Sequence, residues 1–310
     1  MEVIGTIIPI FAIIILGWVV RKRGLITEEF LEPANRLVFH LSLPAMIFNA
    51  IAKADFHKEF DGRVLGITLL SAATIYLLAE LLARVAKMAP ARAGAFVQSS
   101  GHGNQAYIGL PIALYYLGEV GLAKASIVCG FLMILQNILS VVALQLHGTS
   151  TKGLPSPRVL AGKLLGNPVI LGAMAGIVIS ALALPIPRVI GRVLQILGGL
   201  APPMALLLIG ASLSLELMRK YLRPTMGAVT MKLLALPALG LLLFHLFHLG
   251  PADYLPALIL LASPTATVAY VMSREMRGDA DFIVATISAS TLFSSLFIMA
   301  WLTLVAGFAG

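Results

Sequence analysis

The stretch from Gln98 to Pro111, which decides the fold, reads QSSGHGNQAYIGLP. A second stretch of the same character, from Leu261 to Tyr270, reads LASPTATVAY. Each places glycine or proline beside small polar side chains in the middle of a long apolar run. In hydrocarbon, unwound backbone is tolerated only where protein or a water-filled cavity surrounds it, because its N–H and C=O groups would otherwise lack partners. Both stretches therefore predict helix breaks in the protein interior.

The rest of the composition requires lipid as the solvent. The 310 residues are 59% hydrophobic and 12% charged, and the mean hydropathy is +0.96. A span needs about 20 mainly apolar residues, so the chain holds about ten spans and little soluble domain. The first run is followed by Arg21, Lys22 and Arg23, which predicts an uncleaved span rather than a removable signal. The spans are expected at 3–22, 32–53, 63–86, 92–117, 120–147, 160–183, 187–217, 224–248, 252–274 and 280–308.

The two halves of the chain share an ordered set of helix breakers. Offsets of 154 to 160 residues pair Pro33 with Pro187, Pro44 with Pro203, Asn104 with Pro264, Gly118 with Gly278, and Glu119 with Asp279. An odd number of spans per half means that the second half enters the membrane from the opposite face. We therefore expect an all-α integral membrane protein of ten transmembrane helices in a 5+5 inverted repeat. Residues 1–148 form the first repeat, 149–159 a Gly/Pro-rich linker and 160–310 the second.

The net charge of +8 does not indicate a nucleic-acid partner, because the basic residues are scattered over short loops without interleaved aromatics. With the amino terminus outside, the inside loops hold most of the Lys and Arg, and the outside loops hold Lys53, Lys58, Arg63, Lys124, Arg188 and Arg192. The positive-inside rule then predicts both termini outside. Cys129, the single cysteine, lies in an apolar run and predicts a packing residue.

The two broken stretches are also the candidate substrate site. A break leaves free N–H groups and the positive dipole end of a half-helix, which hold anions. The expected binding residues are Gly103, Asn104, Gln105, Tyr107, Pro264, Thr265, Ala266, Thr267 and Tyr270. No arginine or lysine is expected beside either break, so half-helix dipoles and amides would have to hold the anion. The two tyrosines are expected to cap the cavity.

Coupling or gating residues are sought among the ionisable and polar side chains within spans, because burying such groups in lipid is expensive. Glu80 and Lys232 fall in the third and eighth spans, which are paired by the repeat. Each lies about two turns from the end of its span, so its side chain can alternatively snorkel to the membrane interface. The other candidates are His102, Gln136, Asn137 and Glu275. For His102 a purely structural role is an equal alternative. Gln136 and Asn137 could instead form hydrogen bonds between helices. Glu275 is expected to lie at the membrane interface. No metal site and no cofactor are expected, and proton or sodium coupling both stay open.

Four segments carry a family resemblance: IIPIFAIIILGWVVRKRGLI, LVFHLSLPAMIFNAIAK, GNQAYIGLP and SPTATVAYV. In order and spacing the chain resembles the auxin efflux carrier family of bacterial and plant membrane transporters, over essentially its whole length. The resemblance implies a fold like that of the bile-acid sodium symporters. A scaffold domain (helices 1, 2, 6, 7) and a transport domain (helices 3–5, 8–10) would move past each other, an elevator-type mechanism. It also implies a bacterial cytoplasmic membrane protein, with a homodimer formed through the scaffold.

In that family the fourth and ninth spans cross at the substrate site. Plant members carry Pro-Asn at the fourth-span crossover where this chain has Gly103-Asn104, and Pro264 matches the ninth-span proline. Glycine permits a bend that proline imposes. Family substrates are small carboxylates, including auxin and, in bacterial members, dicarboxylates such as malate or malonate. The resemblance thus implies a small-carboxylate carrier surrounded by membrane lipid.

Three alternatives compete with an organic-anion carrier driven by the membrane potential or by protons. A sodium-coupled symporter would use Asn104, Gln105, Gln136, Glu275 and unwound carbonyls as oxygen ligands. A cation/proton antiporter would need paired carboxylates in the core of a span, and the spans hold no such pair. A membrane-embedded enzyme would need a nucleophile with its base, or a metal cluster, and the spans offer no convincing set. The prediction is therefore a transporter and not an enzyme.

Overall fold

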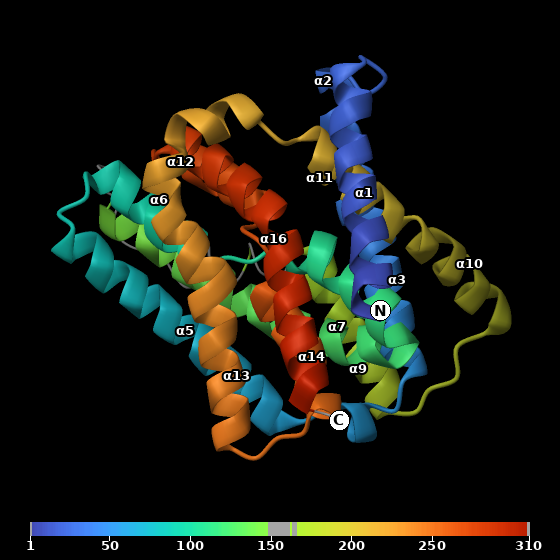
Figure 1. The fold of residues 1–310 in the computed structure, drawn as a ribbon. Coiled ribbons are helices and arrows are strands. Elements are labelled where there is room, and N and C mark those ends of the chain that lie inside the picture. Colours follow the sequence, from blue (N-terminus) through green and yellow to red (C-terminus); the bar gives the residue numbers. More distant parts are fainter. Residues whose placement is uncertain (1, 148–161, 163–165, 309–310) are drawn as a thin grey trace. The chain divides into compact units, whose positions relative to one another are not determined.

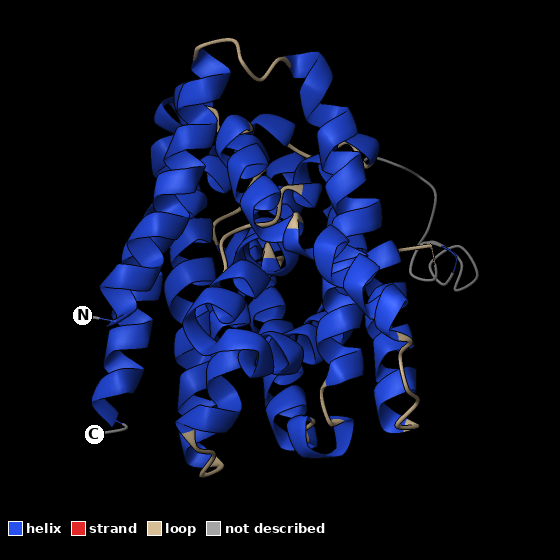
Figure 2. Cartoon of the chain, turned by 90° about the vertical axis from the view of Figure 1, so that its right-hand side faces the viewer, coloured by secondary structure: helices blue, strands red, loops and turns tan. Residues whose placement is uncertain are grey.

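Helices make up the regular secondary structure of the computed structural model, which describes residues 2–147, 162 and 166–308 (Figure 1, Figure 2). The predicted linker, residues 149–159, lies outside the described residues. The helices, with π-helical turns written η, are α1 (Glu2–Lys22), α2 (Glu28–Leu37), η1 (Val38–Ser42), α3 (Leu43–Lys53), α4 (Phe56–Glu59), α5 (Gly62–Val85), α6 (Pro90–Gly101), η2 (Gln105–Gly109), α7 (Leu110–His147), α9 (Pro168–Ala181), α10 (Arg188–Gly199), α11 (Ala201–Ala211), α12 (Leu215–Thr230), η3 (Met231–Ala235), α13 (Leu236–Leu246), α14 (Pro251–Ala262), α15 (Val268–Glu275) and α16 (Ala280–Phe308).

Within the described residues, six continuous helical segments, some of which join consecutive elements, are long and apolar enough to cross a membrane, and α9 and α14 are shorter apolar helices. The segment from Gln105 to His147 has 43 residues, about twice what one crossing needs. Gly118 interrupts it with φ 70° and ψ −165°, a conformation that is nearly exclusive to glycine. The all-helical membrane class is therefore confirmed, while ten spans in an inverted repeat stay a prediction.

One predicted interval is wrong. Residues 218–223, expected to connect two spans, lie inside α12, where Arg219, Lys220 and Arg223 are exposed on the helix surface. The connection lies earlier in the chain: α11 ends at Ala211. Ser214 caps α12 by accepting a hydrogen bond from the Leu217 N–H at 3.4 Å. The cations do not mark a loop here, because long cationic side chains are good helix formers on a water-exposed face.

The chain divides into two compact units: residues 1–62, 106–131 and 161–212 form the first, and residues 63–105, 132–160 and 213–310 the second. In the first unit α1 packs on α11 and α3 on α9. A Cβ on Gly17 would stand 2.0 Å from the Leu207 carbonyl oxygen, and one on Gly210 would stand 1.8 Å from that of Ile14. Glycine is therefore required where α1 and α11 touch, as in closely packed membrane helices generally.

In the second unit α12 packs against α16 (Figure 1), and α6 contacts both. The unit has its own apolar core, which includes Tyr76, Phe96, Phe282 and Ile283. Arg92 at the start of α6 pairs with Asp279, through Nε and Oδ2 at 3.0 Å. The predicted division into scaffold and transport domains stays a prediction.

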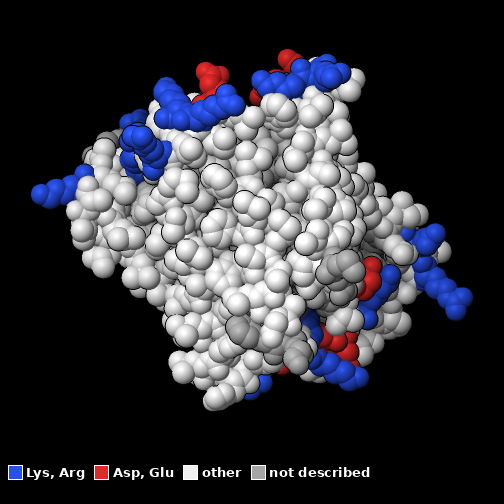
Figure 3. Space-filling model, viewed as in Figure 1, with Lys and Arg blue, Asp and Glu red and all other residues white. Residues whose placement is uncertain are grey.

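Large apolar side chains remain on the surface, among them Leu77 at 71% exposure and Val189 at 75%. Figure 3 shows wide areas of the viewed face without charged side chains. A surface of this kind is suited to contact with lipid.

Candidate functional site

Two helix interruptions meet in the second unit. The first lies between the end of α6 at Gly101 and the start of η2 at Gln105, and the second between the end of α14 at Ala262 and the start of α15 at Val268. Gly103 and Thr265 form an isolated antiparallel bridge at this point. The Asn104 N–H donates to the Pro264 carbonyl at 2.7 Å, and the Ala266 N–H donates to the His102 carbonyl at 2.9 Å. The unwound segments thus supply each other's backbone partners, which allows them to persist away from water.

Thr265 ties the bridge to α6 and to α16. Its hydroxyl donates to the Ser99 carbonyl at 3.0 Å, and its N–H donates to the Ser290 hydroxyl of α16 at 3.1 Å. The side chain is fully buried. Thr265 was predicted as a binding residue, and its polar atoms hold the break in place.

Gln136, from the second half of α7, satisfies the other broken end. Its Nε2 donates to the Gly101 carbonyl at 2.9 Å. Its Oε1 accepts from the Gly103 N–H at 3.2 Å and from Gln105 Nε2 at 2.7 Å. Asn137, its neighbour in the sequence, is half-buried, and no side-chain hydrogen bond of it is found among the described residues. Of this predicted polar pair, the structure brings only Gln136 to the break.

His102 belongs to a buried hydrogen-bond chain that links the break to α7 and α5. Its Nδ1 lies 2.9 Å from the Ser140 hydroxyl, which lies 2.7 Å from the Tyr76 hydroxyl. A Cβ on Gly101 would stand 2.1 Å from the Tyr76 ring, so glycine is needed there for that ring to pack. Tyr76 and Ser140 were not predictable from the sequence, because each is only one of many polar residues within the apolar spans.

Lys232 corrects one expectation and excludes the snorkelling alternative. Instead of snorkelling, its side chain is fully buried. Its Nζ donates to the Leu261 carbonyl at 2.7 Å and lies 3.0 Å from where a Cβ on Gly103 would stand. The expectation that no lysine lies beside the breaks was therefore wrong, because folding brings η3 to α14 and the sequence does not place them together. π-Helical turns such as η3 are frequent at functional sites.

The site holds more positive charge and donor capacity than its protein partners use. Lys232 has no carboxylate partner among the described residues. Asn104 is 5% exposed, and its Nδ2 finds no acceptor there. The positive dipole end of α15 begins two residues after Ala266. A buried cation and a buried free donor are costly to leave alone, so this set of groups favours an anion.

The remaining predicted residues have other partners. The Tyr107 hydroxyl donates to the Asn35 carbonyl at 3.3 Å within the first unit. Tyr270 accepts a hydrogen bond from Arg274 Nη1 at 3.2 Å, and Thr267 is half-buried just before α15. Glu80 pairs with Arg84 Nε at 2.6 Å and His147 Nε2 at 2.8 Å, and Glu275 is exposed at the end of α15.

The described residues offer no cluster of three or more His, Cys, Asp or Glu side chains that would hold a metal ion.

Comparison with known proteins agrees with a membrane carrier. A family model described as a membrane transport protein matches residues 2–154 and 155–302. Over 302 residues the chain is 26% identical to the "Putative malonate transporter" of Rhizobium meliloti, covering 94% of this chain and 92% of that protein. Over 297 residues it is 20% identical to an "Uncharacterized transporter" of Methanothermobacter thermautotrophicus, covering 96% of both.

Proposed function

The chain belongs to the family of membrane transport proteins that includes the auxin efflux carriers, and on this basis we propose that it is a secondary transporter of a small organic anion, with its binding site at the paired helix interruptions. The anion would be a carboxylate. A relative named as a putative malonate transporter supports a small dicarboxylate as the first compound to test.

The buried Lys232 ammonium beside Gly103 carries the proposal. It has one carbonyl as its acceptor and no carboxylate partner in the described part of the chain, so a substrate carboxylate would complete its surroundings. Asn104 Nδ2 would add a hydrogen bond, since it is buried without an acceptor. Hydrogen bonds between a charged and a neutral group are worth about 1.5–3 kcal/mol, enough for micromolar to millimolar binding when a few are combined.

The division of the chain supports alternating access by movement of rigid bodies. Asn104, Pro264, Thr265 and Lys232 all belong to the second unit. The unit has its own apolar core, and its two breaks are fixed by backbone hydrogen bonds. A carrier of the elevator type requires a body of this kind, which keeps its site intact while it moves.

A sodium-coupled symporter of the bile-acid type is less well supported. Of its expected oxygen ligands, Gln136 Oε1 already accepts from Gly103 and Gln105, and Glu275 is exposed at a helix end. The Leu261 carbonyl accepts from Lys232, and a sodium ion next to that ammonium would be repelled.

The test is uptake of labelled malonate and malate into proteoliposomes that contain the purified full chain. We expect saturable flux, which Asn104→Ala should lower by about tenfold or more, because one hydrogen bond to a charged group is lost. Asn49→Ala is the matched control, since Asn49 Oδ1 on α3 is also buried without a partner but lies in the first unit. Absence of saturable flux in the wild type, or an Asn104→Ala variant that equals it, would refute the proposal.

A further inference from the structure

The π-helical turn η3 owes its shape to a proline that follows it. In an α-helix a carbonyl accepts from the N–H four residues further on. Pro237 has no N–H to give to the Leu233 carbonyl, and its ring would crowd that carbonyl in a regular helix. The chain widens instead, and the Leu236 N–H donates to the Met231 carbonyl, five residues back. The π-helical turns in the described part of the chain all stand directly before a Leu-Pro pair, at Leu43-Pro44, Leu110-Pro111 and Leu236-Pro237.

Trp301 of α16 supplies the donor that Pro237 lacks. Its Nε1 donates to the Leu233 carbonyl at 2.9 Å. Leu233 is fully buried, and a buried carbonyl without a partner is costly. Tryptophan often serves as an anchor at the membrane interface, but the N–H of this indole is directed at the backbone of another helix. The hydrogen bond therefore stabilises η3 in its widened form.

The face of α16 that carries Trp301 also packs against η3. Phe293, Phe297 and Trp301 follow one another at four-residue intervals, which places them on one side of the helix. Phe293 and Phe297 pack against a buried cluster that includes Val229 and Leu233. Trp301 thus continues an apolar stripe and adds one directed hydrogen bond to it.

The shape of η3 decides where Lys232 lies. An α-helix turns by about 100° per residue, so the extra residue of a π-helical turn changes which side of the axis the neighbouring side chains face. Lys232 directly precedes Leu233 and is fully buried. Its Nζ donates to the Leu261 carbonyl at 2.7 Å and lies 3.0 Å from where a Cβ on Gly103 would stand. These contacts depend on the turn that Trp301 holds.

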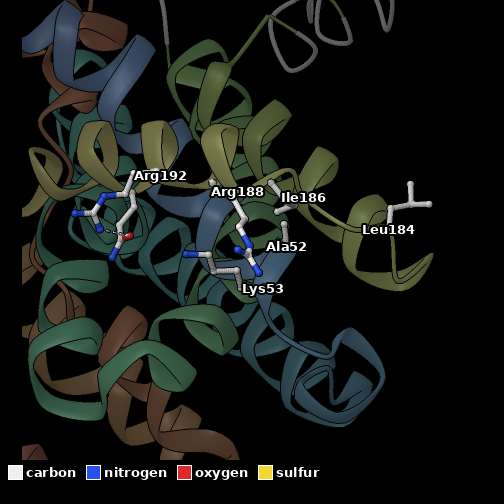
Figure 4. A pocket seen from close by; sticks show the side chains of 8 residues that line it. Ala52, Lys53, Leu184, Ile186, Arg188 and Arg192 are labelled. Carbon is white, nitrogen blue, oxygen red and sulfur yellow. Dashed lines mark hydrogen bonds between the residues drawn. The ribbon is translucent and has the colours of Figure 1, made fainter.

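The position of Lys232 matters more than that of an exposed cation. A pocket of about 390 Å³ where α3 ends and α10 begins has Lys53, Arg188 and Arg192 among its lining residues, and all three are exposed (Figure 4). Water and salt screen such charges. Lys232 is shielded from both, so a displacement of its Nζ directly changes its attraction for an anion.

We propose that Trp301 is a positioning residue for the substrate site: its indole N–H holds η3 in the shape that places Lys232 beside the paired helix interruptions. Trp301 acts through Lys232 and does not contact the substrate. The inference rests on the proposed function, in which the Lys232 ammonium binds the carboxylate. Trp301, Leu233, Lys232 and Gly103 all belong to the second unit.

The test is a double-mutant cycle of Trp301→Phe and Lys232→Met, measured as malonate uptake by proteoliposomes that contain the full chain. Phenylalanine keeps an apolar ring and removes the donor. We expect Trp301→Phe to raise KM about three- to tenfold and to leave Vmax per folded protein within about twofold, because binding is weakened while the unit stays intact. In the Lys232→Met background it should raise KM no further, since the two residues act together.

Trp18→Phe is the matched control, because Trp18 is the other tryptophan of the chain and lies half-buried on α1 in the first unit. It should transport as the wild type. A wild-type KM for Trp301→Phe, or the same increase in KM in both backgrounds, would refute the positioning role and leave Lys232 as the ligand. A wild-type KM for Lys232→Met would refute the proposed function instead.

Thermal unfolding tests the positioning role without transport. Alanine at position 103 would press on the Lys232 Nζ that the wild-type turn holds in place. Gly103→Ala should therefore lower Tm less in the Trp301→Phe protein than in the wild type, because the lysine can move away once the turn is released. Equal losses of Tm in the two proteins would contradict the inference, whether or not malonate is carried.

Discussion

Lys232 and Asn104 lie at the same break, but only one of them was recognisable in the sequence. Asn104 stands between two glycines and a proline in an apolar run, and this local pattern predicted both the break and its polar lining. Lys232 stands far from either break in the chain, and the fold brings its Nζ to Gly103. A local sequence pattern predicts the side chains that lie within a helix break. A charged side chain on another helix can be placed at the break only from the tertiary structure.

Replacing Lys232 by methionine should separate binding from stability. We expect the apparent affinity for the carboxylate to fall tenfold or more, by about 1.5–3 kcal/mol, because a charged hydrogen-bond donor is lost. The free energy of unfolding should change little, since removal of a buried charge offsets loss of the bond to the Leu261 carbonyl. Concentration-dependent flux and thermal unfolding measure the two quantities.

Lys220→Met serves as the control for this substitution, because Lys220 is exposed and lies over the Tyr221 ring. It should transport normally. A Lys232→Met variant with the wild-type KM would show that the ammonium does not contact the substrate.

At the scale of the helix, α7 depends on one residue for its bend. Gly118 has φ 70° and ψ −165°, and no atom lies within 4 Å of where its Cβ would stand. Alanine would meet no clash there, so any cost comes from the backbone alone. We expect Gly118→Ala to destabilise the protein by about 1–3 kcal/mol.

Gly66→Ala provides the comparison for this prediction. Gly66 also has open space around its Cβ position, but it lies within the regular helix α5. Alanine is favoured there by about 0.5–1 kcal/mol. Equilibrium unfolding of both variants in detergent should therefore give opposite signs. Two changes of the same sign would mean that the bend at Gly118 is not required by the fold.

Helix positions were predictable where apolar runs end at glycine or proline, as at Gly118 and Pro251. They were not predictable where a helix is amphipathic and its cations are exposed, as in α12. The interruptions at Gly103 and Thr265 were expected from composition. Their direct pairing by backbone hydrogen bonds was not, because a bridge depends on two segments meeting in space.

For the whole molecule, the sequence predicted membrane insertion from hydropathy, but the division into units required the structure. Each unit draws residues from separate parts of the chain, and residues 106–131 join the first unit although the segments on either side of them belong to the second. No composition shift marks residues 105 or 131 in the sequence. Such boundaries depend on which helices pack together, and local hydrophobicity does not report this.

The orientation of the chain is predicted by its loop charges and is open to direct measurement. With both termini outside, alkaline phosphatase fused to the carboxyl end should be active and green fluorescent protein there should be dark. A truncated fusion after Lys87, in a predicted inside connection, should give the reverse pattern. Fluorescence from the carboxyl-terminal fusion would contradict the predicted orientation.

The hydrogen bond from the Gly103 N–H to Gln136 also constrains how this site can evolve. Proline has no N–H, so the Pro-Asn pair of plant family members would remove one of the two hydrogen bonds that Gln136 Oε1 accepts here. The larger ring would also press on Lys232, whose Nζ occupies the space above Gly103. Gly103, Gln136 and Lys232 should therefore be inherited together. Relatives that acquire the proline are expected to have changed the glutamine and the lysine as well.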